Sequence, residues 1–125
     1  MSQAPIDPAS AQARIDAIQK RYREWIRLVP KLEAAQQDWQ RGVEIMRELA
    51  QFYFEGEYLQ YTQAMEEGLD INLHTEGEYS VMSEDALWNA FHEQHSLAWQ
   101  RLRSAIAVLD SDAQANSQTA SPQAQ

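Results

Sequence analysis

The stretch that decides the fold is residues 15–54, IDAIQKRYREWIRLVPKLEAAQQDWQRGVEIMRELAQFYF. Two positions recur in it every seven residues, through six heptads without a change of phase, and they are apolar everywhere except at Gln36. The first position holds Ile15, Tyr22, Val29, Gln36, Val43 and Ala50, and the second holds Ile18, Trp25, Leu32, Trp39, Met46 and Tyr53. A period of about 3.5 residues keeps one face of a helix turned toward a partner helix. We therefore predict one long helix that packs against another helix.

Pro30 lies inside this pattern but does not shift its phase. A proline within a helix removes one backbone hydrogen bond and costs about 3 kcal/mol. Two all-α architectures are therefore open. In the first, Pro30 only kinks a long N-terminal helix, which forms an antiparallel, coiled-coil-like hairpin with a C-terminal helix, and a short helix and a loop lie between them. In the second, the chain reverses near Pro30 and forms a three-helix bundle. The intact phase favours the hairpin.

The second half of the chain supplies the other elements of the hairpin. Residues 57–67 are amphipathic and stop before Gly68, a typical C-cap, and residues 70–82 predict a loop. Ser83 precedes two acidic residues, as N-caps do, so we predict a helix over 83–109. We expect Trp88, Phe91 and Trp99 to face Trp39, Met46 and Tyr53 of the long helix. The apolar stripe of the C-terminal helix consists of Trp88, Phe91, His95, Trp99, Leu102, Ile106 and Leu109.

Both ends of the chain are polar. We expect a disordered lead-in over residues 1–9, in which Asp7 before Pro8 marks a helix start, a single helical domain over 10–110 and a disordered tail over 111–125.

The 125 residues include no cysteine and no apolar run of the roughly 20 residues that span a bilayer. The N-terminus also lacks the basic and apolar regions of a secretory signal. These features predict a cytoplasmic protein that does not enter a membrane.

The net charge of −9 is unevenly distributed. Residues 14–31 contain six basic and two acidic side chains, whereas residues 48–100 contain eleven carboxylates and no lysine or arginine. Such an acidic chain is repelled by nucleic acid over most of its surface, so we expect no nucleic-acid partner. The apolar and basic part of the long helix, around Tyr22, Trp25, Ile26 and Arg27, is our candidate partner-binding surface. Its partner is expected to be another protein or a second copy of this chain in a homodimer.

No residue of the chain is assigned a catalytic, cofactor-binding or metal-binding role. His92 and His95 are a close pair, but His95 belongs to the aromatic stripe and is expected to be packed and hydrogen-bonded. The leading hypothesis is a non-enzymatic protein–protein interaction or regulatory module. The alternative is a magnesium-dependent, all-α nucleotide hydrolase that uses carboxylates of the middle segment. Its candidate ligands are Glu66, Glu67, Asp70, Glu84 and Asp85.

Two stretches of the sequence resemble a small bacterial domain-of-unknown-function family, number 4298. Residues 52–58, FYFEGEY, are similar to the YYGSxEW feature of that family, and residues 79–88, YSVMSEDALW, are similar to its GVLSEDAIYDLL entry to the last helix. Ser80 stands where the family tends to have glycine, and Tyr58 where it tends to have tryptophan. The resemblance covers residues 15–109 and implies the same helical layout and a bacterial source. The family has no assigned activity, so the resemblance supplies no catalytic residues.

Overall fold

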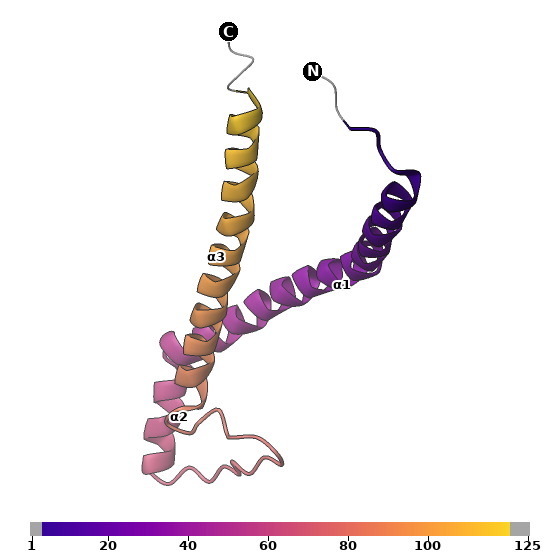
Figure 1. Cartoon of the computed structure of the whole chain (residues 1–125). Helices are drawn as coiled ribbons and strands as arrows, with labels where there is room; N and C mark the ends of the chain where they lie inside the picture. Colours follow the sequence, from indigo (N-terminus) through magenta and orange to yellow (C-terminus); the bar gives the residue numbers. More distant parts are fainter. Residues whose placement is uncertain (1–3, 121–125) are drawn as a thin grey trace. The chain divides into compact units, whose positions relative to one another are not determined.

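The computed structural model describes residues 4–120, and the side chains of residues 4–116. Within this part of the chain it contains three helices and no strand. Helix α1 spans Pro8–Phe54, α2 spans Glu57–Glu66 and α3 spans Ala86–Ala120 (Figure 1). The predicted all-α class, with a long first helix and a short helix and loop before the last one, is confirmed. None of the described helices combines the length and the apolar content that crossing a membrane requires.

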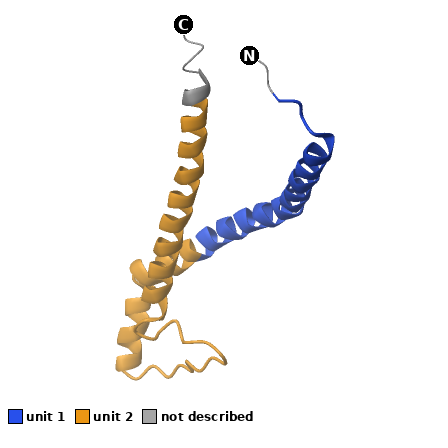
Figure 2. Cartoon of the chain, viewed as in Figure 1, with its two compact units in different colours: residues 1–45 blue, residues 46–125 orange. Residues whose placement is uncertain are grey.

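The chain divides into two compact units where the sequence predicted a single domain over 10–110. Unit 1 is residues 1–45 and unit 2 is residues 46–125 (Figure 2). Most of α1 belongs to unit 1. Unit 2 contains the last turns of α1 together with α2 and α3. Only unit 2 therefore has several helices from which to build a core.

Helix α1 begins where Asp7 and Pro8 predict. The Asp7 Oδ2 atom accepts hydrogen bonds from Ser10 N at 3.1 Å and from Ser10 Oγ at 2.8 Å, which makes Asp7 the N-cap. These bonds to the charged carboxylate lower the pKa of Asp7 below its ordinary 3.8. The helix thus starts two residues before the end of the predicted lead-in over 1–9, and residues 1–3 lie outside the described part of the chain.

Pro30 does not end the first helix. α1 is continuous from Pro8 to Phe54 with Pro30 inside it, and Figure 2 shows the helix of unit 1 curving without a break. The alternative three-helix bundle broken near Pro30 is therefore wrong. The physical reason is that the proline costs one hydrogen bond within 47 helical residues, and a helix can bend around such a gap.

Unit 2 is held together by aromatic side chains. Phe91 of α3 stacks on Phe54 of α1, with ring centroids 5.4 Å apart, and meets Tyr53 edge-on at 5.6 Å. The ring centroids of Tyr58 of α2 and Tyr53 lie 4.9 Å apart, and the Tyr58 hydroxyl donates a hydrogen bond to the Met82 carbonyl at 3.4 Å. Leu87, at 3% exposure, is the single buried hydrophobic side chain in the described part of the chain. The two stretches that carry the family resemblance thus meet in this core.

Glycines in the left-handed region set the ends of α2. Gly56, with φ of 108°, separates α1 from α2, and Gly68, with φ of 106°, follows the last turn of α2. Leu69 N donates back to the Ala64 carbonyl at 2.9 Å, as in a typical C-terminal cap. The predicted end of the short helix at Gly68 is confirmed.

The bounds of the last helix differ from the prediction at both ends. α3 begins at Ala86 rather than at Ser83, because residues 80–83 form a turn in which Ser83 N donates to the Ser80 carbonyl at 3.0 Å. It then continues to Ala120, so residues 111–120 of the predicted disordered tail are helical, and residues 121–125 lie outside the described part. No glycine or proline occurs between Leu109 and Pro122 to stop the helix.

Candidate partner-binding surface

Much of the heptad seam of unit 1 is exposed, although Val29, Trp39 and Val43 are partly buried. No residue of α1 is buried. We call the five large apolar side chains on its N-terminal half the arm stripe, and their exposed fractions lie between 48% and 61%. The arm stripe consists of Ile15, Ile18, Tyr22, Trp25 and Leu32. Contiguous exposed apolar surface of this kind marks interaction sites on natural proteins.

The four candidate residues do not all lie on this side of the helix. Tyr22 and Trp25 belong to the arm stripe, and Ile26, four residues after Tyr22, lies about 40° from it around the helix. Arg27 is two residues after Trp25 and lies about 200° from it. The structure therefore brings Tyr22, Trp25 and Ile26 together and places Arg27 on the other side of α1. The four residues are close together in the sequence, but the helical period separates Arg27 from the other three.

Arginines border the arm stripe. Arg21 and Arg23 directly precede and follow Tyr22, so they lie about 100° to either side of it. Arg21 Nη1 forms an ion pair with Glu24 at 2.9 Å, but both side chains are exposed and such pairs contribute little to stability. Arg14 lines a shallow depression together with Ile15, Ile18, Gln19 and Tyr22. The surface therefore combines apolar contact area with flanking positive charge.

The large apolar residues of α3 end at Leu109. Unit 2 places Tyr53 against Phe91, and Leu109 lies 18 residues after Phe91 just as Ala35 lies 18 residues before Tyr53. Residues 110–120 contain no apolar side chain larger than alanine. The arm stripe lies N-terminal to Ala35 in the sequence.

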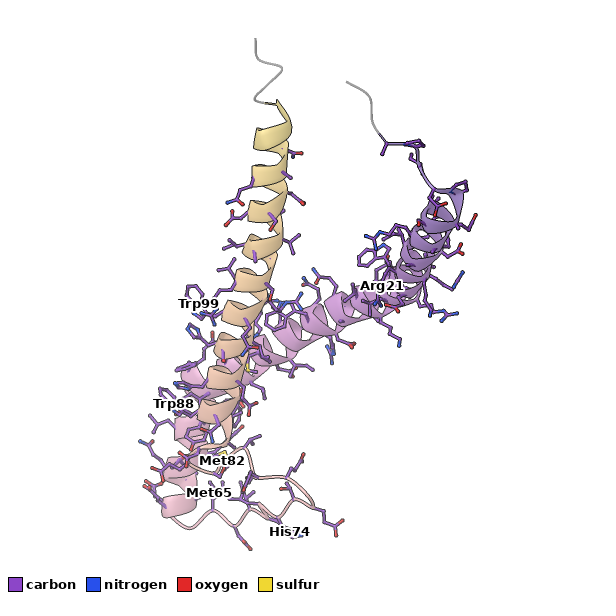
Figure 3. The ribbon with its side chains drawn as sticks, in the orientation of Figure 1. Arg21, Met65, His74, Met82, Trp88 and Trp99 are labelled. Atoms are coloured by element: carbon purple, nitrogen blue, oxygen red, sulfur yellow. The ribbon has the colours of Figure 1, made fainter. Side chains whose placement is uncertain are left out.

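A second exposed surface runs along α3. Figure 3 shows Trp88 and Trp99 on the same side of this helix, and they are 51% and 48% exposed. The Trp88 ring lies 4.6 Å from that of His92, whose Nδ1 is 2.9 Å from the Trp88 carbonyl oxygen. Trp99 Nε1 donates a hydrogen bond to His95 Nε2 at 3.0 Å. With Ile106, one helical face thus bears an aromatic ladder, defined as Trp88, His92, His95, Trp99 and Ile106.

Of the three aromatic residues predicted to face the long helix, Phe91 packs on the end of α1 within unit 2, and the buried residue beside it is Leu87 rather than Trp88. Trp88 follows Leu87 directly and therefore lies about 100° further round α3. His95 is hydrogen-bonded as predicted, but it is exposed rather than packed in a core.

The carboxylates of the alternative hypothesis are not assembled into a metal site. Glu66 is the last residue of α2 and Glu67 is its C-cap, so Glu67 and Asp70 do not share a helical turn. Glu84 and Asp85 lie in the turns before α3. Within the described residues, no three histidine, aspartate or glutamate side chains are grouped so that they could hold a metal ion.

One family model matches most of this chain. The family model described as Domain of unknown function (DUF4298) matches residues 15–104 of this chain. The chain belongs to the DUF4298 family. No curated protein and no solved structure matches the sequence. The sequence-based resemblance to this family is therefore confirmed.

The DUF4298 match includes the arm stripe, the aromatic core and the ladder as far as Trp99. It begins at Ile15, the first residue of the arm stripe, and ends at Ser104, one turn beyond Trp99. It therefore spans residues of unit 1 as well as unit 2. The DUF4298 domain is thus a helical unit with a long first helix, and its description assigns it no function.

Proposed function

We propose that this DUF4298 protein is a cytoplasmic, non-enzymatic protein–protein interaction module that binds its partner through the arm stripe. The observation that carries the proposal is that the five large apolar side chains of the arm stripe are exposed. Full burial of a large apolar side chain contributes about 1.5–3 kcal/mol, and each half-exposed side chain of the arm stripe would gain part of this before the cost of association is subtracted.

The charges around the arm stripe indicate the chemistry of the partner. Residues 14–31 contain six basic and two acidic side chains. An acidic helix with its own apolar face would satisfy both the apolar residues and the flanking arginines. Opposite charges on the two surfaces speed their encounter and make the complex sensitive to salt. The partner is therefore expected to present an acidic, apolar helical surface.

Site-specific cross-linking tests this proposal directly. Tyr22 is replaced with the photo-cross-linking amino acid p-benzoylphenylalanine in the full-length chain in cells. A matched control carries the same amino acid at Ala34, which lies nine residues after Trp25 and so on the opposite side of α1. We expect irradiation to give protein adducts at position 22 but not at position 34. Lysis at high salt before irradiation should reduce the position-22 adducts.

Equal cross-linking at the two positions together with nucleotide turnover would favour the magnesium-dependent hydrolase. Equal cross-linking from positions 22 and 34 would remove the evidence for a binding surface on the arm stripe. If the purified chain then hydrolysed a nucleotide in the presence of Mg²⁺, and substitution of Glu84 and Asp85 abolished this turnover, the hydrolase hypothesis would replace the interaction module.

A further inference from the structure

The aromatic ladder has the properties expected of the surface that the arm stripe binds. Both lie on helices and both are exposed. From Trp88 to Ile106 the ladder covers 18 residues, or about 27 Å of helix. From Ile15 to Leu32 the arm stripe covers 17 residues, or about 26 Å. The two surfaces therefore match in length.

We propose that the arm stripe of one copy packs on the aromatic ladder of a second copy, so that two chains form a reciprocal dimer. This inference rests on the proposed function and names its partner as a second copy of this chain. In such a dimer each copy uses its arm stripe and its ladder once. The symmetry is closed, which is the commonest form of homo-oligomer.

Charge supports contact between unit 1 of one copy and unit 2 of the other. Residues 1–45 contain seven basic and six acidic side chains, whereas residues 46–125 contain three basic and thirteen acidic ones. Contact between two arms would bring two basic segments together, since residues 14–31 of each carry a net charge of +4. Contact between an arm and the ladder of the other copy sets the basic arm beside residues 84–112, which contain five acidic and two basic side chains, with the carboxylates mostly at the two ends of the ladder.

The chemistry of the ladder also suits the arm. Arginine guanidinium groups bind preferentially over the faces of tryptophan rings, and the ladder exposes Trp88 and Trp99. Arg21 and Arg23 lie on either side of Tyr22 in the arm. They are therefore placed to reach past the apolar contact to the tryptophans or to the acidic residues that precede α3.

The fold leaves the ladder free for another molecule. Within unit 2, α1 meets α3 on the side of Leu87 and Phe91. Trp88 lies about 100° round α3 from Leu87 and about 60° from Phe91, whereas His95 lies about 40° from Phe91. The ladder therefore adjoins the face of α3 that the end of α1 contacts, and its side chains are exposed.

Complementation between two variants tests the dimer. The arm variant carries Tyr22→Ala and Trp25→Ala, and the ladder variant carries Trp88→Ala and Trp99→Ala. All four positions are about half exposed, and alanine keeps helix propensity high, so both variants should retain the wild-type circular dichroism. A control carries Leu97→Ala and Val108→Ala, exposed apolar residues nine positions after Trp88 and Trp99 and so opposite the ladder. Trp99→Gln alone serves as a second ladder variant.

Sedimentation equilibrium of the purified full-length chains gives the readout. We expect the wild type and the control to dimerise at tens of micromolar, with affinity falling roughly tenfold between low and high salt. Each variant alone should be monomeric. An equimolar mixture of the arm and ladder variants should form a heterodimer, because the intact arm of one fits the intact ladder of the other.

Three outcomes would overturn the inference. The first is a wild-type monomer at both salt concentrations. The second is a ladder variant that dimerises as well as the wild type, which would point to contact between two arms. The third is no association in the mixture. If the chain is monomeric but position 22 still cross-links to a different protein, the reciprocal dimer is wrong and the interaction module stands.

Discussion

The two halves of the heptad seam have different surroundings although they belong to the same helix. At its C-terminal end, in unit 2, Met46, Ala50 and Tyr53 are partly buried, and Tyr53 lies against Phe91. At its N-terminal end, in unit 1, Tyr22 and the rest of the arm stripe are exposed. The residue types are alike, and within unit 2 the end of α1 packs against α2 and α3. A heptad seam thus predicts that a face requires a partner, but not which molecule supplies it.

The largest expected difference between the two units is in how much an aromatic-to-alanine substitution lowers the free energy of unfolding. Phe91→Ala removes the ring that contacts both Tyr53 and Phe54, and we expect it to destabilise unit 2 by about 3–5 kcal/mol. Trp25→Ala removes an exposed ring and should change the unfolding free energy by no more than about 0.5 kcal/mol. Urea unfolding at high salt and low protein concentration, where self-association is weakest, measures both. Equal losses from the two substitutions would show that the arm stripe is covered within the monomer.

The contrast between the units also shows what the sequence could predict. The heptads predicted α1, and Asp7, Pro8 and Gly68 marked helix ends that the structure confirms. These signals are local, because a cap or a helical period depends on residues within a turn or two. The contact between Tyr53 and Phe91 followed from matching two apolar stripes.

The wrong predictions concern which side of a helix faces its neighbour, because the local pattern of apolar residues does not decide this. The stripe on α3 is wide, and three- and four-residue steps from Trp88 do not decide whether Trp88 or Leu87 turns inward. Packing against Phe54 and α2 decides it, in favour of the side that carries Leu87 and Phe91. The helical period could have separated Arg27 from Trp25 in advance, since two residues correspond to about 200°. The aromatic ladder was missed because its residues were assigned to the seam.

Removing Pro30 should stabilise unit 1 and leave unit 2 unchanged. Pro30→Ala restores an amide that can donate within α1, and a proline inside a helix costs about 3 kcal/mol. We expect slower amide hydrogen exchange on both sides of residue 30, with unchanged exchange around Phe91. Glu33→Ala, in the same helix, is a control for added helix propensity. Unchanged exchange in unit 1 would mean that the helix accommodates Pro30 without loss.

Replacing a glycine with alanine should stabilise the helix in unit 1 but destabilise unit 2. Gly42 lies inside α1, and an added Cβ would meet nothing within 4 Å, so Gly42→Ala should stabilise the helix by about 1 kcal/mol. Gly56 also has open space around it, but its φ of 108° disfavours any side chain, so Gly56→Ala should destabilise unit 2 by about 1–2 kcal/mol. Thermal unfolding followed by circular dichroism measures both. Stabilisation by Gly56→Ala would contradict the left-handed junction between α1 and α2.

The smallest effect is expected at the first turn of α1, where the cap is titratable. The two hydrogen bonds from Ser10 lower the pKa of Asp7 from its ordinary 3.8, so the helical state favours the charged carboxylate. The cap therefore contributes its full stabilisation above about pH 4, and this is lost as the pH falls through the lowered pKa of the folded state. NMR titration of the Ser10 amide should follow this transition. Asp7→Asn keeps a good N-cap without an ionisable group, so its Ser10 amide signal should lose this titration. A Ser10 amide that titrates alike in both proteins would show that Asp7 does not cap α1.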